Sequence, residues 1–153
     1  MNKIPFCKPC IDQGDIDAVT KVLRSGDLIN VDLVDQFERD FAAYVGSKYA
    51  IAVSSCTSAL FLSLKYIDVK GKDVAVSPLT FTASASTIHH AGGKPVWYDV
   101  DFDTLLMKQP KEAYAVVVHL TGNRSDVRVD NTVHDSAHLV ERNCYLGCLQ
   151  CFS

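Results

Sequence analysis

The stretch AYAVVVHL, residues 113–120, is almost entirely apolar and is predicted to form a β-strand. On both sides of it the chain alternates between short apolar runs and longer amphipathic segments. Further strands are expected at 49–53, 73–77, 95–100, 131–135 and 145–153, and helices at 12–25, 32–45, 54–67 and 80–93. Strands that alternate with helices indicate an α/β fold with a mostly parallel sheet.

The composition describes one globular domain. The chain has 153 residues, of which 48% are hydrophobic and 22% charged, and this balance is typical of a folded protein. A net charge of −3 and the lack of a Lys/Arg cluster argue against a nucleic-acid partner. No apolar run is long enough to span a membrane, and the start, MNKIPFCKPC, has no secretory signal, so a cytoplasmic location is expected.

The cysteines include two C-x-x-C pairs, Cys7/Cys10 and Cys148/Cys151. Two such pairs can hold a structural zinc ion, although small buried residues can also be cysteine without binding a metal. The second pair falls in a predicted strand, where side chains alternate between faces, whereas a zinc knuckle needs a turn. No metal site is therefore predicted.

The stretch SSCTS, residues 54–58, lies between a predicted strand and a predicted helix. Backbone N–H groups at the start of a helix, together with hydroxyls, can bind an anion, most often a phosphate. The simpler interpretation is that Ser55 only caps the helix. Neither a Walker loop nor G-x-G-x-x-G is present, which disfavours a nucleoside triphosphatase and an ordinary dinucleotide-binding protein.

Three further residues stand at or just beyond the ends of predicted strands. Phe81 can be a core residue or can cover the face of a flat ligand, and Asp135 can simply start a turn or cap a segment. His119 is most simply a structural histidine. In parallel sheets, ligands bind beyond the carboxyl ends of the strands. A phosphate site, an aromatic ring, an acid and the imidazole of His138 together suit pyridoxal phosphate (PLP), whose pyridine nitrogen a carboxylate keeps protonated.

The chain also resembles a known family, the DegT/DnrJ/EryC1/StrS family of PLP-dependent sugar aminotransferases. The matching stretches run in order along almost the whole chain: IPFCKP (4–9), VLRSGDL (22–28), FERDFAAYVGSKYAIAVSSCTSAL (37–60), SPLTFTASAS (77–86), AGGKPVWYDVDFDTL (91–105), VVHLTG (117–122), HDSAH (134–138) and CFS (151–153).

The resemblance implies a fold-type I transferase. Its large domain is a three-layer α/β/α structure, followed by a smaller C-terminal domain, and two copies form a homodimer with shared active sites. The implied reaction moves an amino group from glutamate or glutamine to a keto sugar attached to a nucleotide, with pyridoxal phosphate or pyridoxamine phosphate as the cofactor.

The resemblance also assigns roles to single residues. Cys56, Thr57 and Ser58 are expected to hold the cofactor phosphate, with a further contact from Ser153. The remaining residues are expected around the ring: Phe81 stacks on it, Asp135 binds the pyridine nitrogen and His138 lies near the phenolic oxygen.

Several features depart from the family pattern. The Schiff-base lysine is expected a few residues beyond CFS, so no catalytic residue is assigned, and residues 1–153 are expected to be a truncated PLP-binding large domain without the lysine segment and the small domain. The connections MKQPKEA (107–113) and NRSDVRVDN (123–131) are too short for the usual helices, which leaves the strand order after residue 105 open. Cys56 replaces a usual glycine, and INVDL (29–33) replaces the usual substrate signals.

Three functions remain open at this point. The chain can be part of an aminotransferase completed by a longer chain or a partner, and it is then an enzyme only in that assembly. It can instead be a non-catalytic remnant that binds a ligand or another subunit. It can also be part of a pyridoxamine-phosphate-dependent sugar dehydratase. A serine hydrolase is disfavoured, because G-x-S-x-G is missing.

Overall fold

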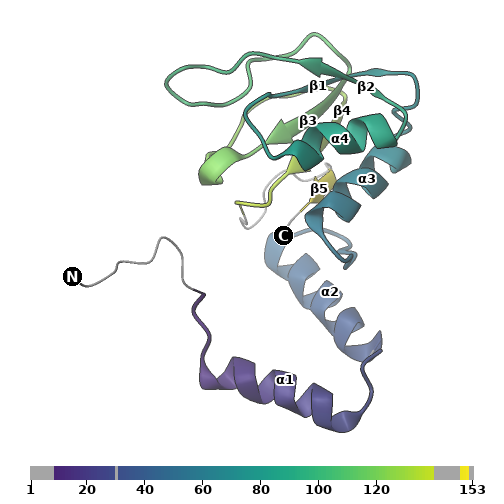
Figure 1. The fold of residues 1–153 in the computed structure, drawn as a ribbon, viewed down its shortest axis with the longest axis vertical. Coiled ribbons are helices and arrows are strands. Elements are labelled where there is room, and N and C mark those ends of the chain that lie inside the picture. Colours follow the sequence, from purple (N-terminus) through teal and green to yellow (C-terminus); the bar gives the residue numbers. More distant parts are fainter. Residues whose placement is uncertain (1–8, 30, 140–148, 152–153) are drawn as a thin grey trace, which may run out of the picture. The chain divides into compact units, whose positions relative to one another are not determined.

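The computed structural model describes residues 9–29, 31–139 and 149–151 (Figure 1). The chain divides into two compact units, Met1–Phe37 and Glu38–Ser153, and each is described by itself. The predicted strand at 145–153 is therefore seen only as the three-residue strand β5, Leu149–Cys151. Asn30, Ser153 and one cysteine of each C-x-x-C pair, Cys7 and Cys148, lie outside the described residues.

Helix α1, Gln13–Ser25, lies in the first unit. The Asp12 side chain accepts a hydrogen bond from the Asp15 backbone, and the Asp15 side chain accepts one from Asp12, which makes a capping box. Gly26 ends the helix in the left-handed conformation at φ 72°, where glycine pays no steric penalty. The helix predicted at 12–25 is confirmed.

Helix α2, Val31–Val45, crosses the boundary between the units, and Ala42 and Val45 near its end are buried. The strand predicted at 49–53 is wrong: no strand forms there, and Tyr49 and Ile51 are 72% and 79% exposed. An apolar run becomes a strand only when another strand pairs with its backbone, and none of the described strands does so here. The Ala52 N–H instead donates to the Glu38 carboxylate, at 2.7 Å.

The second unit is built on a five-stranded sheet in the order β2-β1-β3-β4-β5, in which each adjacent pair is parallel. The strands are β1 (Asp73–Val76), β2 (Lys94–Trp97), β3 (Tyr114–Val118), β4 (Asn131–Asp135) and β5. β2 is shorter than the 95–100 predicted, because Val100 pairs with Met107 in an isolated antiparallel bridge instead. The α/β fold with a mostly parallel sheet is confirmed, and the strand order after residue 105 is now known.

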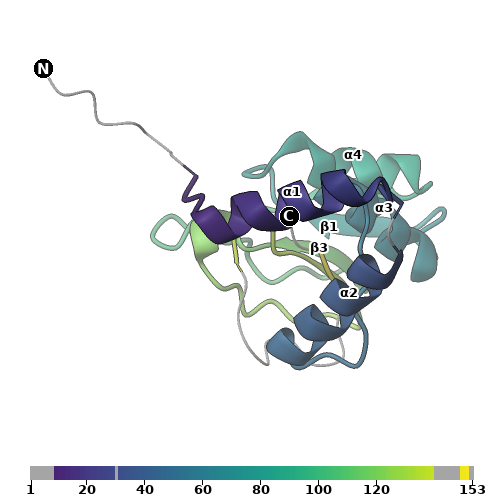
Figure 2. The same cartoon turned by 90° about the horizontal axis from the view of Figure 1, so that it is seen from below.

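Helices α3 (Cys56–Tyr66) and α4 (Thr82–His90) lie on one face of this sheet (Figure 2). Their apolar residues and those of the strands bury one another in the main core. This core contains Leu60, Leu64, Val69, Val74, Val76, Ala83, Ile88, Ala91, Val116 and Val133. The core fixes the starts of α3 and α4 over the carboxyl ends of the strands.

The opposite face of the sheet is covered differently in the described residues. Met107 and Val127, both from loops, pack on Ala75, Ala115 and Val117 of the strands. This second cluster contains no helical residue. The short connections noted in the sequence therefore form a thin loop layer, with one short 3₁₀ turn, η1 (Leu120–Gly122), at the end of β3.

The core predicts a clear difference between two leucines of α3. Leu64 is fully buried, whereas Leu62 is 53% exposed. We expect Leu64→Ala to lower the free energy of unfolding by about 2–5 kcal/mol, because it removes buried contacts and leaves a cavity. The matched control, Leu62→Ala, should change it by less than about 0.5 kcal/mol. Urea unfolding of both variants measures this, and equal losses would contradict the assigned core.

Candidate functional site

The candidate site is centred on Asp135, the last residue of β4, which is only 7% exposed. The Ser84 hydroxyl of α4 donates to Asp135 Oδ2 at 2.6 Å, and the Cys56 thiol of α3 lies 3.8 Å from Oδ1. The Ala137 N–H donates to Oδ1 at 3.3 Å. A buried carboxylate is costly unless donors surround it, and here two helices and the following turn supply them.

Ser84 is itself part of a short chain of hydroxyls. Thr80 Oγ1 and Ser84 Oγ lie 2.8 Å apart. Because an ionised carboxylate can only accept, Ser84 uses its proton on Asp135, and Thr80 must donate to Ser84. Sequence reasoning missed Ser84. The signal was a small polar residue on a helix face shared with the buried Ala83, Thr87 and Ile88.

The start of α3 is rich in hydroxyls. Ser55 is the N-cap and accepts a hydrogen bond from the Ser58 N–H at 3.2 Å, so the simple capping role is present. The Ser58 hydroxyl lies 3.1 Å from the hydroxyls of both Ser54 and Ser55. Thr57 is exposed on the first turn. This end of the helix combines hydroxyls with the positive end of the helix dipole, as an anion site does.

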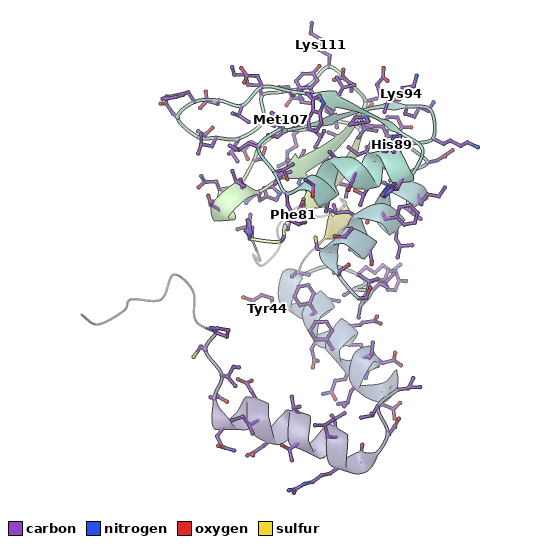
Figure 3. The ribbon with its side chains drawn as sticks, viewed as in Figure 1. Tyr44, Phe81, His89, Lys94, Met107 and Lys111 are labelled. Carbon is purple, nitrogen blue, oxygen red and sulfur yellow. The ribbon has the colours of Figure 1, made fainter. Side chains whose placement is uncertain are left out.

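The predicted aromatic residue, Phe81, stands three residues before Ser84 in the chain. Phe81 is the N-cap residue of α4, and its carbonyl accepts a hydrogen bond from the Ser84 N–H at 3.1 Å (Figure 3). Its ring is 77% exposed, so it is not the core residue that the simpler interpretation proposed. An exposed ring at this position has a face available to a flat ligand.

The remaining predicted residues are placed in part. His138 is exposed and lies in the turn after β4, three residues beyond Asp135. Ser153 lies outside the described residues. β5 pairs Cys151 with Asp135, so it runs toward the same end of the sheet. The structure thus brings Cys56 and Asp135 into contact, with Thr57 and Ser58 on the same helical turn as Cys56.

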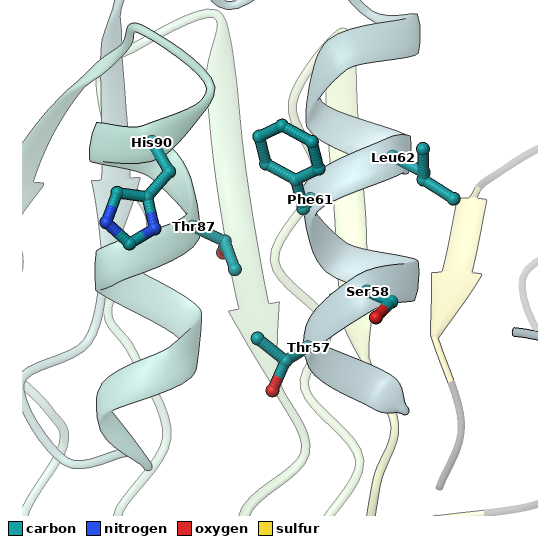
Figure 4. Close-up of a pocket in the computed structure, with 6 residues that line it drawn as sticks. All are labelled: Thr57, Ser58, Phe61, Leu62, Thr87 and His90. Atoms are coloured by element: carbon teal, nitrogen blue, oxygen red, sulfur yellow. The ribbon is translucent and has the colours of Figure 1, made fainter. Parts of the chain in front are cut away.

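A hollow of about 590 Å³ runs between α3 and α4 (Figure 4). It is lined by Thr57, Ser58, Phe61, Leu62, Thr87 and His90. The hollow shares Thr57 and Ser58 with the candidate site but does not contain Asp135 or Phe81. The hollow therefore overlaps the candidate site only at the first turn of α3.

His119 has the structural role predicted for it, and its partner is a residue that sequence reasoning missed. His119 Nε2 lies 3.0 Å from Nδ1 of His134, and both residues are buried. The Ser125 N–H donates to His119 Nδ1 at 3.1 Å. Burial lowers the pKa of His119 to about 4 and that of His134 to about 3.

Among the described residues, no three His, Cys, Asp or Glu side chains gather as metal ligands would. Cys10, the described member of the first C-x-x-C pair, is exposed. None of the helices in the described ranges is both long enough and apolar enough to cross a membrane.

Curated relatives are similar to this chain over most of its length. The spore coat polysaccharide biosynthesis protein SpsC of Bacillus subtilis (strain 168) is 42% identical over 133 residues, which are 81% of this chain and 34% of SpsC. The UDP-4-amino-4,6-dideoxy-N-acetyl-beta-L-altrosamine transaminase of Campylobacter jejuni is 36% identical over 90% of this chain and 35% of the relative. The chain thus spans about a third of these relatives.

Solved structures show the same fold. The aminotransferase from Psychrobacter cryohalolentis has a TM-score of 0.78 and 31% identity, over 89% of this chain and 40% of that one. Spr1654 of Streptococcus pneumoniae in its PLP form has a TM-score of 0.81 and 28% identity, over 90% and 44%. Residues 9–139 match the DegT/DnrJ/EryC1/StrS aminotransferase family, and the chain therefore belongs to that family.

Proposed function

We propose that this chain forms the part of a PLP-dependent sugar aminotransferase that holds the pyridine ring and the phosphate of the cofactor. The observation that carries the proposal is the buried carboxylate of Asp135, held between the starts of α3 and α4 at the carboxyl end of β4. Spr1654, which has the same fold, has been solved in a PLP form, and this supports the choice of cofactor.

The residues present fit this cofactor. Ser84 and the Ala137 N–H keep the Asp135 carboxylate in one orientation. Each carboxylate oxygen can also accept a further hydrogen bond. A protonated pyridine nitrogen is such a donor, and the resulting charge-assisted bond is short and strong. When bound, the cofactor supplies an electron-accepting ring that carries an amino group between two substrates.

The other residues take roles around that bond. Thr57, Ser58 and the backbone of Cys56 hold the phosphate at the N-terminal end of α3, where the helix dipole favours an anion. The exposed ring of Phe81 covers one face of the pyridine ring. His138, in the turn after β4, lies toward the phenolic oxygen, and Ser153 adds a phosphate contact.

The substrates in this proposal are a nucleotide-linked keto sugar and, as amino donor, glutamate or glutamine. The name of the Campylobacter jejuni relative, a UDP-sugar transaminase, and that of SpsC, a polysaccharide biosynthesis protein, support a sugar substrate. Residues 1–153 serve as the PLP-binding large domain, in the cytoplasm, in a homodimer or with a chain that completes the site. The chain covers only about a third of the length of these relatives, so this activity belongs to the complete assembly.

Replacing the charged partner of the ring tests the proposal most directly. We expect Asp135→Asn to weaken binding of pyridoxal phosphate by about 10- to 100-fold, because a neutral amide cannot hold the ring nitrogen in its charged form. Binding of inorganic phosphate should not change. Absorption titrations of both ligands measure this, with Asp130→Asn, an exposed carboxylate just before β4, as the control. Equal binding by the two variants would remove Asp135 from the site.

The hydroxyl that holds Asp135 gives a second test. Ser84→Ala removes a 2.6 Å hydrogen bond to a buried charge, and we expect it to lower the free energy of unfolding by about 1.5–3 kcal/mol. Ser86, an exposed serine of the same helix, is the matched control, and Ser86→Ala should change stability by less than about 0.5 kcal/mol. Urea unfolding at pH 7 compares them. If Ser84→Ala leaves the free energy of unfolding unchanged, the hydrogen bond from Ser84 is not needed to stabilise the buried carboxylate of Asp135.

Covalent trapping distinguishes a complete catalyst from a cofactor-binding part. We expect borohydride reduction of this chain with pyridoxal phosphate to trap no adduct at a defined lysine, because none of its lysines stands at the motif position of the Schiff-base lysine. Binding itself should be weak. Peptide mass spectrometry after reduction reports the result, and a stoichiometric adduct at one lysine would show that the chain is complete for this step.

A further inference from the structure

The two buried histidines lie directly behind Asp135. His119 follows β3, and His134 precedes Asp135 in β4. Because successive strand residues point to opposite faces, His134 points away from the face on which Asp135 meets α3 and α4. Both histidine side chains are 1% exposed, and neither takes part in the proposed binding of the cofactor.

The hydrogen bonds of the pair allow one arrangement of protons. A backbone N–H can only donate, so the bond from Ser125 requires that His119 Nδ1 carries no proton. Neutral His119 then carries its proton on Nε2 and donates to His134 Nδ1, 3.0 Å away. The ring planes lie within 4° of parallel, with centroids 5.1 Å apart. In this arrangement both rings are neutral and their facing nitrogens share one proton.

A further proton disturbs this arrangement at either ring. On His134 it would occupy Nδ1, where it would meet the proton of His119 Nε2. On His119 it would occupy Nδ1, where it would meet the Ser125 N–H, although the nearby backbone of Asn123 favours the charged form. Each addition places a charge in a buried position and breaks one of the two hydrogen bonds.

The charged groups around the pair act in both directions. Arg124, in the connection between β3 and β4, disfavours protonation of both rings, and Arg128 disfavours that of His134. Asp135, on β4, favours protonation of His119. At His119 burial outweighs the opposing effect of Asp135, whereas at His134 burial acts together with His119 and the two arginines. The pKa of each ring is therefore lowered, and the pair is neutral at pH 7.

The pair is tied to the position of Asp135 through the backbone. The His119 N–H donates to the Asp135 carbonyl at 3.0 Å, and Val118 is paired with Asp135 in the sheet. The ring–ring bond joins the same two strand ends on the opposite face. Ser84 thus holds the Asp135 carboxylate on the helical face of the sheet. On the opposite face, the two histidines hold the backbone of β4 at Asp135 against the end of β3.

We propose that His119 and His134 are positioning residues that hold Asp135 in its binding position only while both rings are neutral. The proposal rests on the proposed function for the role of Asp135, but the behaviour of the rings is independent of any ligand. Unfolded histidines take up protons near pH 6.5, whereas the folded pair resists them. The stability that the pair contributes is therefore complete above about pH 6.5 and falls as the pH decreases toward 4.

The proton arrangement is tested first, on the unmodified chain without ligand. Long-range ¹H–¹⁵N NMR spectra of the imidazole rings report which ring nitrogens carry protons. We expect bare Nδ1 atoms on both His119 and His134 and protonated Nε2 on His119, with no titration between pH 8 and about 5. Titration of either ring near pH 6.5, or a protonated Nδ1 on His119 at pH 8, would overturn the proposal.

A conservative variant tests the role in positioning. In His134→Asn the amide oxygen replaces Nδ1 as the acceptor but cannot be protonated. At pH 8 it should bind pyridoxal phosphate within about 3-fold of the unmodified chain, whereas His134→Ala, which lacks the acceptor, should bind at least about 10-fold more weakly. Equal binding by His134→Ala and the unmodified chain would overturn the positioning role.

The pH dependence of unfolding supplies the matching control. As the pH decreases from 6.5 to 5, the unfolded chain takes up two protons, one on each histidine, that the folded pair does not. The unfolding equilibrium constant of the unmodified chain should therefore rise by up to about 100-fold per pH unit, and that of His134→Asn, which has lost one of these histidines, by up to about 10-fold. His89→Asn, at an exposed position of α4, should keep the unmodified slope. Identical slopes for all three chains would overturn the proposal.

The two proposals can fail separately. Failure of the unmodified chain to bind pyridoxal phosphate at pH 8 would count against the proposed function, while the NMR spectra of the rings would still decide the protonation state of the histidine pair.

Discussion

Asp135 places a carboxylate at the end of β4 with almost no exposure to water, and such a charge is stable only where donors converge on it. The Ser84 hydroxyl supplies the shortest of these contacts, and the Cys56 thiol lies on the other oxygen. Because Ser84 belongs to α4 and Cys56 to α3, the Asp135 side chain links the starts of both helices, which the core holds in place, to the end of β4. In the proposed function, the exposed ring of Phe81 and the hydroxyls at the start of α3 would contact the same ligand as this carboxylate.

The sequence predicts this part of the molecule well where a residue acts through its local pattern. Ser55 caps α3, as predicted, because its short side-chain oxygen reaches a backbone N–H group of the next turn. The apolar runs at 73–77, 113–120 and 131–135 all contain strands of the parallel sheet. Asp135 is expected at the mouth of the sheet, since polar residues at strand ends meet there.

The sequence fails where the outcome depends on a distant neighbour. The run at 49–53 is as apolar as a central strand, yet it forms none, because a strand also requires a backbone that pairs with it. Ser84 and His134 give no local sign of their partners, which lie 51 and 15 residues away in the chain. Their roles follow from the register of the strands and from the placement of α4, and no periodicity encodes either one.

Contacts on both faces of β4 hold the Asp135 carboxylate in position. On the helical face, Asp135 presents a charge whose direction is fixed by hydroxyl and thiol donors. On the face covered by loops, where no helix supports the sheet in the described residues, His134 and His119 join the ends of β4 and β3. A thin loop layer buries less apolar surface than a helix does, so it stabilises the strand ends less. A hydrogen-bonded ring pair compensates at the one position where a displaced strand end would move the carboxylate.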